Sequence, residues 1–223
     1  MNKYIKKIPI LRSIVRFFSP STIPFDNSEE YWISRYDKGG NSGPGSYNEL
    51  AQFKAKLLND FVSKNNINTV IEFGSGDGNQ LRFANYPNYL GFDVSSKAIE
   101  LCREIFSDDH SKSFKLVSDY SGEVAELVLS LDVIYHLVED EIFEDYMQKL
   151  FGSSSGFVAI YSSNTNDQSG NTLSHVKHRK FTDWIEKNKP NWQLTTHIPN
   201  EIKFQGDANK GSFADFYIYE VIK

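Results

Sequence analysis

Short apolar segments alternate with helical patterns along much of this 223-residue chain. The helical patterns include one that opens at a Ser46-x-x-Glu49 capping box, one capped by Ser95 and one capped by Asp140. Strands separated by helices fold into a parallel sheet with helices on both faces. The segments that read as buried strands are residues 69–73, 89–93, 114–117, 127–131 and 157–162.

The C-terminal part of the chain departs from this alternation. Residues 192–198 and 213–222 read as two strands joined by a glycine-containing loop without a helix, so we expect an antiparallel hairpin at the sheet edge. The predicted fold is therefore α/β: a doubly wound sheet of seven strands, mostly parallel, with an antiparallel C-terminal β-hairpin edge.

Composition excludes several classes of protein. The single cysteine, Cys102, cannot form a disulfide within the chain, which is typical of a cytoplasmic protein. A net charge of −5 argues against binding to a nucleic-acid backbone. No apolar run reaches the roughly 20 residues that a membrane-spanning helix needs.

The basic residues are concentrated at the N-terminus. The first 18 residues hold five basic side chains and no acidic one, and their apolar side chains share one face of a predicted short helix. We expect residues 1–28 to form a basic amphipathic arm and linker, ahead of a single domain from 29 to 223. The arm is expected either to dock on that domain or to make peripheral contact with the inner face of an anionic membrane.

A glycine-rich turn follows the first strand, and Asp93 ends the second strand. Ligands of parallel sheets bind beyond the carboxyl ends of the strands. Glycines at alternate positions, Gly74, Gly76 and Gly78, let the backbone approach a ligand, and a carboxylate at Asp93 can accept hydrogen bonds from ribose hydroxyls. The third glycine of a dinucleotide fingerprint is missing. The pattern therefore predicts a nucleoside-bearing cofactor, and its acidic rim suits a cation better than a pyrophosphate.

The segments VIEFGSGDG and GFDVS resemble motifs I and II of class I S-adenosylmethionine-dependent methyltransferases. AELVLSLDVIYHL resembles the fourth-strand segment of that family, and the resemblance extends from Tyr31 to Lys223. It implies a Rossmann-like fold, S-adenosylmethionine as the cofactor and methyl transfer as the activity. YWISRYDKGGNSG and HVKHRKF resemble small bacterial enzymes associated with polysaccharide biosynthesis, which implies O-methylation of a sugar or glycan precursor.

The resemblance also implies where the cofactor binds. Gly74 and Gly76 would pass beneath the methionine moiety, with Glu72 ordering the loop. Asp93 would bind the ribose diol and Val94 would flank the adenine.

Further cofactor contacts follow from the third and fourth strands. Asp119 would contact the adenine amine, with Tyr120 near the ring, and the backbone at Leu131 and Asp132 would contact the methionine ammonium. Arg35, from the N-terminal part of the domain, is expected to pair with the cofactor carboxylate.

His136 is the candidate catalytic residue. It lies just beyond the fourth strand, and a positioned base assists attack by an alcohol. The alternative is that His136 only shapes its loop. Glu139 and Asp140 are close in sequence, but no ligand spacing accompanies them, so we expect no metal.

Two segments are expected to be loops that close over the cofactor and form the acceptor pocket. The first, Tyr31–Tyr47, is glycine-rich and carries aromatic rings on which a sugar can stack. The second surrounds the HVKHRKF segment; its basic side chains are expected to donate to acceptor oxygens, or else to form a solvated turn. The predicted acceptor-binding residues are Trp32, Tyr36, Tyr47, His175, His178 and Arg179.

Three other functions stay open at the level of the sequence. The chain can be a methyltransferase for another small polar acceptor or an amine. It can also be an NAD-dependent oxidoreductase, although the missing fingerprint glycine and the antiparallel edge argue against this. The third alternative is a non-catalytic cofactor-binding module.

Overall fold

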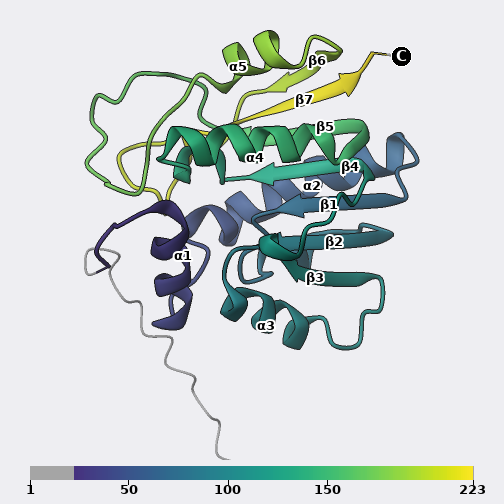
Figure 1. The fold of residues 1–223 in the computed structure, drawn as a ribbon, viewed down its shortest axis with the longest axis horizontal. Coiled ribbons are helices and arrows are strands. Elements are labelled where there is room, and N and C mark those ends of the chain that lie inside the picture. Colours follow the sequence, from purple (N-terminus) through teal and green to yellow (C-terminus); the bar gives the residue numbers. More distant parts are fainter. Residues whose placement is uncertain (1–22, 223) are drawn as a thin grey trace, which may run out of the picture.

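The computed structural model describes residues 23–222, and a seven-stranded sheet runs through their centre (Figure 1). The strands follow the order β3-β2-β1-β4-β5-β7-β6. Pairings among β1 to β5 are parallel, and β7 is antiparallel to both β5 and β6, which confirms the predicted fold class. The strands are β1 (Thr69–Phe73), β2 (Asn88–Asp93), β3 (Lys112–Leu116), β4 (Ala125–Leu131), β5 (Ser154–Ser162), β6 (Trp192–Ile198) and β7 (Asp215–Val221).

Helices cover both faces of the sheet, and α1 lies where the parallel strands end (Figure 1). Side chains of α2 and α3 pack on one face, and those of α4 and α5 pack on the other. None of the helices within residues 23–222 is long and apolar enough to cross a membrane. The helices are α1 (Ser28–Asp37), α2 (Asn48–Lys64), α3 (Ser96–Ile105), α4 (Asp140–Gly152) and α5 (Phe181–Asn188).

The core consists of two apolar layers, one on each side of the sheet. Val70 and Ile71 are neighbours on β1 but belong to opposite layers, because side chains alternate along a strand. Leu58 of α2 completes the first layer and Met147 of α4 the second, and neither side chain is exposed. Burial on both faces explains why the central strands β1 and β4 are nearly continuous apolar runs rather than alternating ones.

The N-terminal predictions need one correction and one restriction. Most of the predicted arm and linker, residues 1–22, lies outside the described residues. The segment expected to be a loop from Tyr31 is helical up to Asp37. The Asn27 side chain caps this helix by accepting from the Glu30 backbone N–H at 2.9 Å, and acidic residues occupy its first turn. The helix ends before Gly39, which has a φ of 78°.

Of three other predicted helix starts, one is confirmed and two are wrong by one or two residues. Ser95 caps α3 as expected, its side chain accepting from the Ala98 N–H. The Ser46 capping box does not form: α2 begins at Asn48, with Tyr47 as the N-cap residue and no side-chain cap. Asp140 is the first residue of α4 rather than its cap. The sequence pattern also missed α5, whose Phe181 is buried against the sheet.

Candidate active site

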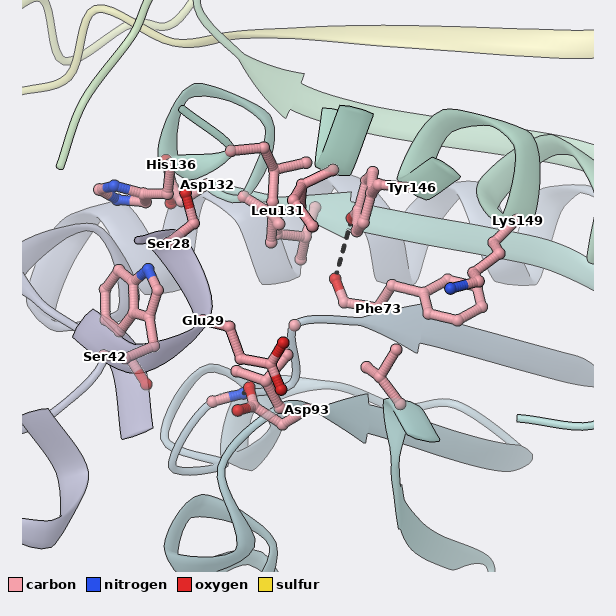
Figure 2. A pocket seen from close by; sticks show the side chains of 18 of the residues that line it. Ser28, Glu29, Ser42, Phe73, Asp93, Leu131, Asp132, His136, Tyr146 and Lys149 are labelled. Atoms are coloured by element: carbon pink, nitrogen blue, oxygen red, sulfur yellow. Dashed lines mark hydrogen bonds between the residues drawn. The ribbon is translucent and has the colours of Figure 1, made fainter. Parts of the chain in front are cut away.

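A cleft opens at the carboxyl ends of the parallel strands, between α1 and α4 (Figure 2). Residues predicted for the site that line it are Trp32, Tyr36, Gly74, Gly76, Asp93, Val94, Leu131, Asp132 and His136. Residues that the sequence did not single out also line it: Ser28, Glu29, Ser42, Ser46, Phe73, Val117, Val133, Leu137, Ile142, Asp145, Tyr146 and Lys149. The cleft therefore combines carboxylates, aromatic rings and aliphatic side chains.

The glycine-rich turn forms the floor of the cleft. Gly74 and Gly76 have φ angles of 90° and 59°, which favour glycine. A Cβ on Gly74 would clash with Val133, and one on Gly76 would clash with Ser42. The turn is anchored to β2, because the N–H of Gly74 donates to the Phe92 carbonyl at 2.7 Å. Close packing on both sides thus requires glycine at these two positions.

Asp93 lies at the end of β2 with its carboxylate in the cleft (Figure 2). Its Oδ2 accepts from the Gly76 N–H and its Oδ1 from the Ser95 N–H, both at 2.9 Å. Burial raises the pKa of Asp93 to about 6, although these two hydrogen bonds oppose the shift. The carboxylate therefore holds the glycine turn and remains able to accept further hydrogen bonds, since each oxygen has a second lone pair.

Glu72 lies beneath the glycine turn rather than in the cleft. Its carboxylate is buried and accepts a hydrogen bond from the Tyr89 hydroxyl at 2.5 Å. Burial raises the pKa of Glu72 to about 7, against the opposing effects of that hydrogen bond and of the Lys54 charge. Its position fits the predicted loop-ordering role better than a direct contact with a ligand.

Asp132, immediately after β4, belongs to a buried charge network. Its Oδ2 pairs with Lys54 Nζ at 2.6 Å, and its Oδ1 accepts from the Tyr135 hydroxyl at 2.7 Å. The Lys54 side chain is fully buried, and its Nζ lies 5.1 Å from the centre of the Tyr161 ring. Asp132 itself has a φ of 60°, so the chain turns sharply here. The network holds the turn that carries His136.

His136 lines the cleft and contacts the segment that follows β5. Its Nδ1 lies 3.0 Å from the backbone carbonyl of His175. Because a carbonyl only accepts, Nδ1 carries the proton, and Nε2 retains a free lone pair. Burial lowers the pKa of His136 to about 4, so the ring is neutral at physiological pH. Trp32 meets the ring edge-on, with 4.9 Å between ring centres.

The covering segment, defined here as residues 28–47, is attached to the cleft at both ends. At one end, Ser28 donates to the Glu139 carboxylate from its hydroxyl at 2.6 Å and from its backbone N–H at 3.0 Å. At the other end, Asp77 accepts from the Ser42 N–H at 2.9 Å and from the Tyr47 hydroxyl at 2.7 Å. These contacts hold the segment closed over the glycine turn.

Some predicted residues do not line the cleft, because their side chains form hydrogen bonds or ion pairs with other groups. Arg35 donates to the Asn41 carbonyl at 2.6 Å and lies over the Trp32 ring, so it organises the covering segment. The Tyr47 hydroxyl donates its hydrogen bond to the Asp77 carboxylate. Arg179 donates to the Val138 carbonyl and pairs with Asp140, so it supports the loop after β4.

The remaining predicted residues surround the cleft without lining it. His175 stacks on the rings of Tyr31 and His136, and the His178 ring is hydrogen-bonded to Ser163 at 2.8 Å. Asp119 is exposed to solvent on the turn after β3. Tyr120 packs edge-on against Phe73 and Phe92, and only Val117 of this turn reaches the cleft.

Helix α4 contributes a wall that the sequence analysis missed. Ile142, Tyr146 and Lys149 follow the spacing of one helix face, a signal that was available in the sequence. The Tyr146 hydroxyl donates to the Phe73 carbonyl at 3.1 Å (dashed in Figure 2), and its oxygen lies 2.7 Å from the Ser130 hydroxyl, which can donate to it. Among residues 23–222, no group of three or more His, Cys, Asp or Glu side chains is arranged to hold a metal ion.

Removing Lys54 is expected to destabilise the fold strongly. Lys54→Met leaves the Asp132 carboxylate buried without its cation, which costs about 3–5 kcal/mol of unfolding free energy. The double variant Lys54→Met/Asp132→Asn is expected to recover part of this loss. Chemical denaturation measures both, with Lys56→Met on the exposed face of the same helix as the control. Equal stability of Lys54→Met and Lys56→Met would contradict the assignment.

The sequence matches no protein-family model and no curated protein, whereas many solved structures share the fold. The N-methyltransferase NodS from Bradyrhizobium japonicum WM9, solved with S-adenosyl-L-homocysteine, has a TM-score of 0.68 and 14% identity, covering 89% of this chain and 100% of that chain. Magnesium protoporphyrin IX methyltransferase (ChlM) from Synechocystis PCC 6803, also with bound S-adenosyl-L-homocysteine, has a TM-score of 0.62 and 12% identity, covering 86% and 97%.

The methyltransferase domain of bacterial CtHen1 is 19% identical, with a TM-score of 0.60, and covers 78% of this chain and 100% of that chain. At such identities the likeness establishes the fold. The chain therefore has the fold of class I S-adenosylmethionine-dependent methyltransferases.

Proposed function

We propose that this protein is an S-adenosylmethionine-dependent methyltransferase. The observation that carries the proposal is the placement of Asp93 beside the glycine turn in one cleft at the carboxyl edge of the sheet. A carboxylate at this position can accept hydrogen bonds from both hydroxyls of a ribose. The structural relatives solved with S-adenosyl-L-homocysteine support the same reading.

The lining of the cleft fits a cationic nucleoside. Val94, Val117 and Ile142 offer an apolar surface for a base, and the carboxylates of Glu29 and Asp93 favour a positive charge. When bound, the cofactor would supply a methyl group on a positively charged sulfur. The protein's task is then to orient an acceptor, keep water out and accept a proton where the acceptor is an alcohol.

The acceptor that we propose is a hydroxyl group of a sugar or glycan precursor. Trp32 and His136 lie on one wall of the cleft, where an aromatic ring can support a sugar and Nε2 of His136 can accept the hydroxyl proton. The His175 carbonyl holds the His136 ring in the tautomer that this role requires. In this proposal, Trp32 contacts the sugar that accepts the methyl group, and His136 is the catalytic base.

Asp93→Ala is expected to weaken binding of S-adenosylmethionine and S-adenosylhomocysteine by about 1.5–3 kcal/mol, because hydrogen bonds to a charged group are lost. Isothermal titration calorimetry measures the change, and a thermal melt of the free variant checks that it is folded. Wild-type protein is expected not to bind NAD. Unchanged affinity in the variant, or tight binding of NAD, would refute the cofactor assignment.

Cofactor affinity is expected to depend on pH through Asp93. The ionised carboxylate accepts both ribose hydroxyls, so affinity is full above the pKa of about 6 in the free protein and falls below it. The fall approaches about tenfold per pH unit, because a proton must leave before binding. Calorimetry with S-adenosylhomocysteine between pH 8 and pH 5 tests this expectation, and a flat profile would contradict it.

His136→Asn is expected to separate catalysis from folding. The asparagine amide can still donate to the His175 carbonyl but lacks the Nε2 lone pair. Methyl transfer to an acceptor identified from a panel of nucleotide sugars should fall about 10²-fold or more in kcat, with cofactor affinity unchanged. Turnover near the wild-type value would mean that His136 only shapes its loop. Turnover with amines but not with sugars would replace the proposed acceptor.

A further inference from the structure

Helix α1 brings a carboxylate into the cleft at a position that no motif of the sequence marks. Glu29, Trp32 and Tyr36 follow the spacing of one helix face, and all three line the cleft. Figure 2 shows the Glu29 side chain reaching into the cleft on the side where Asp93 lies. Glu29 and its neighbour Glu30 are both exposed, but only Glu29 lines the cleft. The two glutamates therefore differ in direction although they share the first turn of α1.

The position of Glu29 is set by the contacts next to it. Ser28 is buried and bound to Glu139 through both its hydroxyl and its backbone N–H, and its Oγ accepts from the Val138 N–H at 2.9 Å. Asn27 caps the helix from the other side. Because these contacts fix the first turn of α1 against the loop after β4, the backbone of Glu29 is held beside the cleft.

Two other carboxylates of the cleft already accept hydrogen bonds from the protein. Asp132 is bound by Lys54 and Tyr135, and Asp93 accepts two backbone N–H groups. Asp145 lies on α4, one helical turn from Lys149, and among the described residues it has no hydrogen bond or ion pair. Within residues 23–222, the Glu29 carboxylate has no hydrogen bond or ion pair. Its oxygens can accept hydrogen bonds from a ligand.

We infer that Glu29 is a cofactor-binding residue whose carboxylate accepts a hydrogen bond from the ribose bound by Asp93, so that α1 and β2 both contact the sugar. This inference rests on the proposed function. It gives α1 a role beyond covering the cleft: cofactor binding and closure of the covering segment reinforce one another, since the same helix carries the contact to Glu139.

The test compares Glu29→Gln with Glu30→Gln, because both variants remove one negative charge from the same helical turn. Calorimetry with S-adenosylhomocysteine should show about tenfold weaker binding for Glu29→Gln and no change for Glu30→Gln. The same comparison is then made with two analogues of S-adenosylhomocysteine, one without the 2′-hydroxyl and one without the 3′-hydroxyl. For the analogue that lacks the hydroxyl contacted by Glu29, the difference in affinity between wild type and Glu29→Gln should be smaller than for S-adenosylhomocysteine itself.

Each outcome decides one point. Binding by Glu29→Gln within twofold of wild type would overturn the inference while leaving the cofactor assignment intact. A loss for S-adenosylmethionine without a loss for S-adenosylhomocysteine would also overturn it, because that pattern indicates charge attraction to the sulfonium and not a ribose contact. Failure of the wild-type protein to bind either compound would refute the proposed function itself.

Discussion

The buried ion pair between Lys54 and Asp132 is the interaction on which the cleft depends. A fully buried ammonium is tolerated only beside an opposite charge, so α2 is locked to the end of β4. The Tyr135 hydroxyl occupies the second carboxylate oxygen. The covering segment rests on the same group, since a Cβ on Gly45 would come within 2.7 Å of Asp132 Oδ2. One carboxylate thus joins the sheet, α2 and the covering segment.

Burial also determines the electrostatic character of the site. It raises the pKa of Asp93 to about 6 and of Glu72 to about 7, and it lowers that of His136 to about 4. When the pKa of a carboxylate is close to the ambient pH, a nearby positive charge stabilises its ionised form. A neutral histidine keeps its lone pair available. The same desolvation therefore favours a positive charge near these carboxylates and leaves a neutral imidazole beside them.

Predictions from the sequence were most accurate where local pattern and topology agree. Each predicted strand overlaps an observed one, and the central strands β1 and β4 are the clearest, because strands buried on both faces are continuous apolar runs. Residues next to strand ends, such as Gly74, Asp93 and His136, line one cleft because the parallel strands end at one edge. Helix α5 was missed because a short helix is stabilised by packing, here of Phe181 on the sheet, rather than by its own pattern.

The sequence by itself determined the strands, the antiparallel C-terminal edge, the glycine turn and the carboxylate that ends β2, since these follow from the apolar pattern along the chain and from backbone conformations that glycine adopts readily. Only the tertiary structure decided where the loop side chains point. Arg179 pairs with Asp140 and Arg35 with Asn41, whereas Glu29 reaches the cleft. Lys54 and Asp132 are 78 residues apart, and their pairing is invisible to any local pattern. A side chain's partner depends on which distant groups burial brings beside it, because a polar group removed from water must find its hydrogen bonds within the protein.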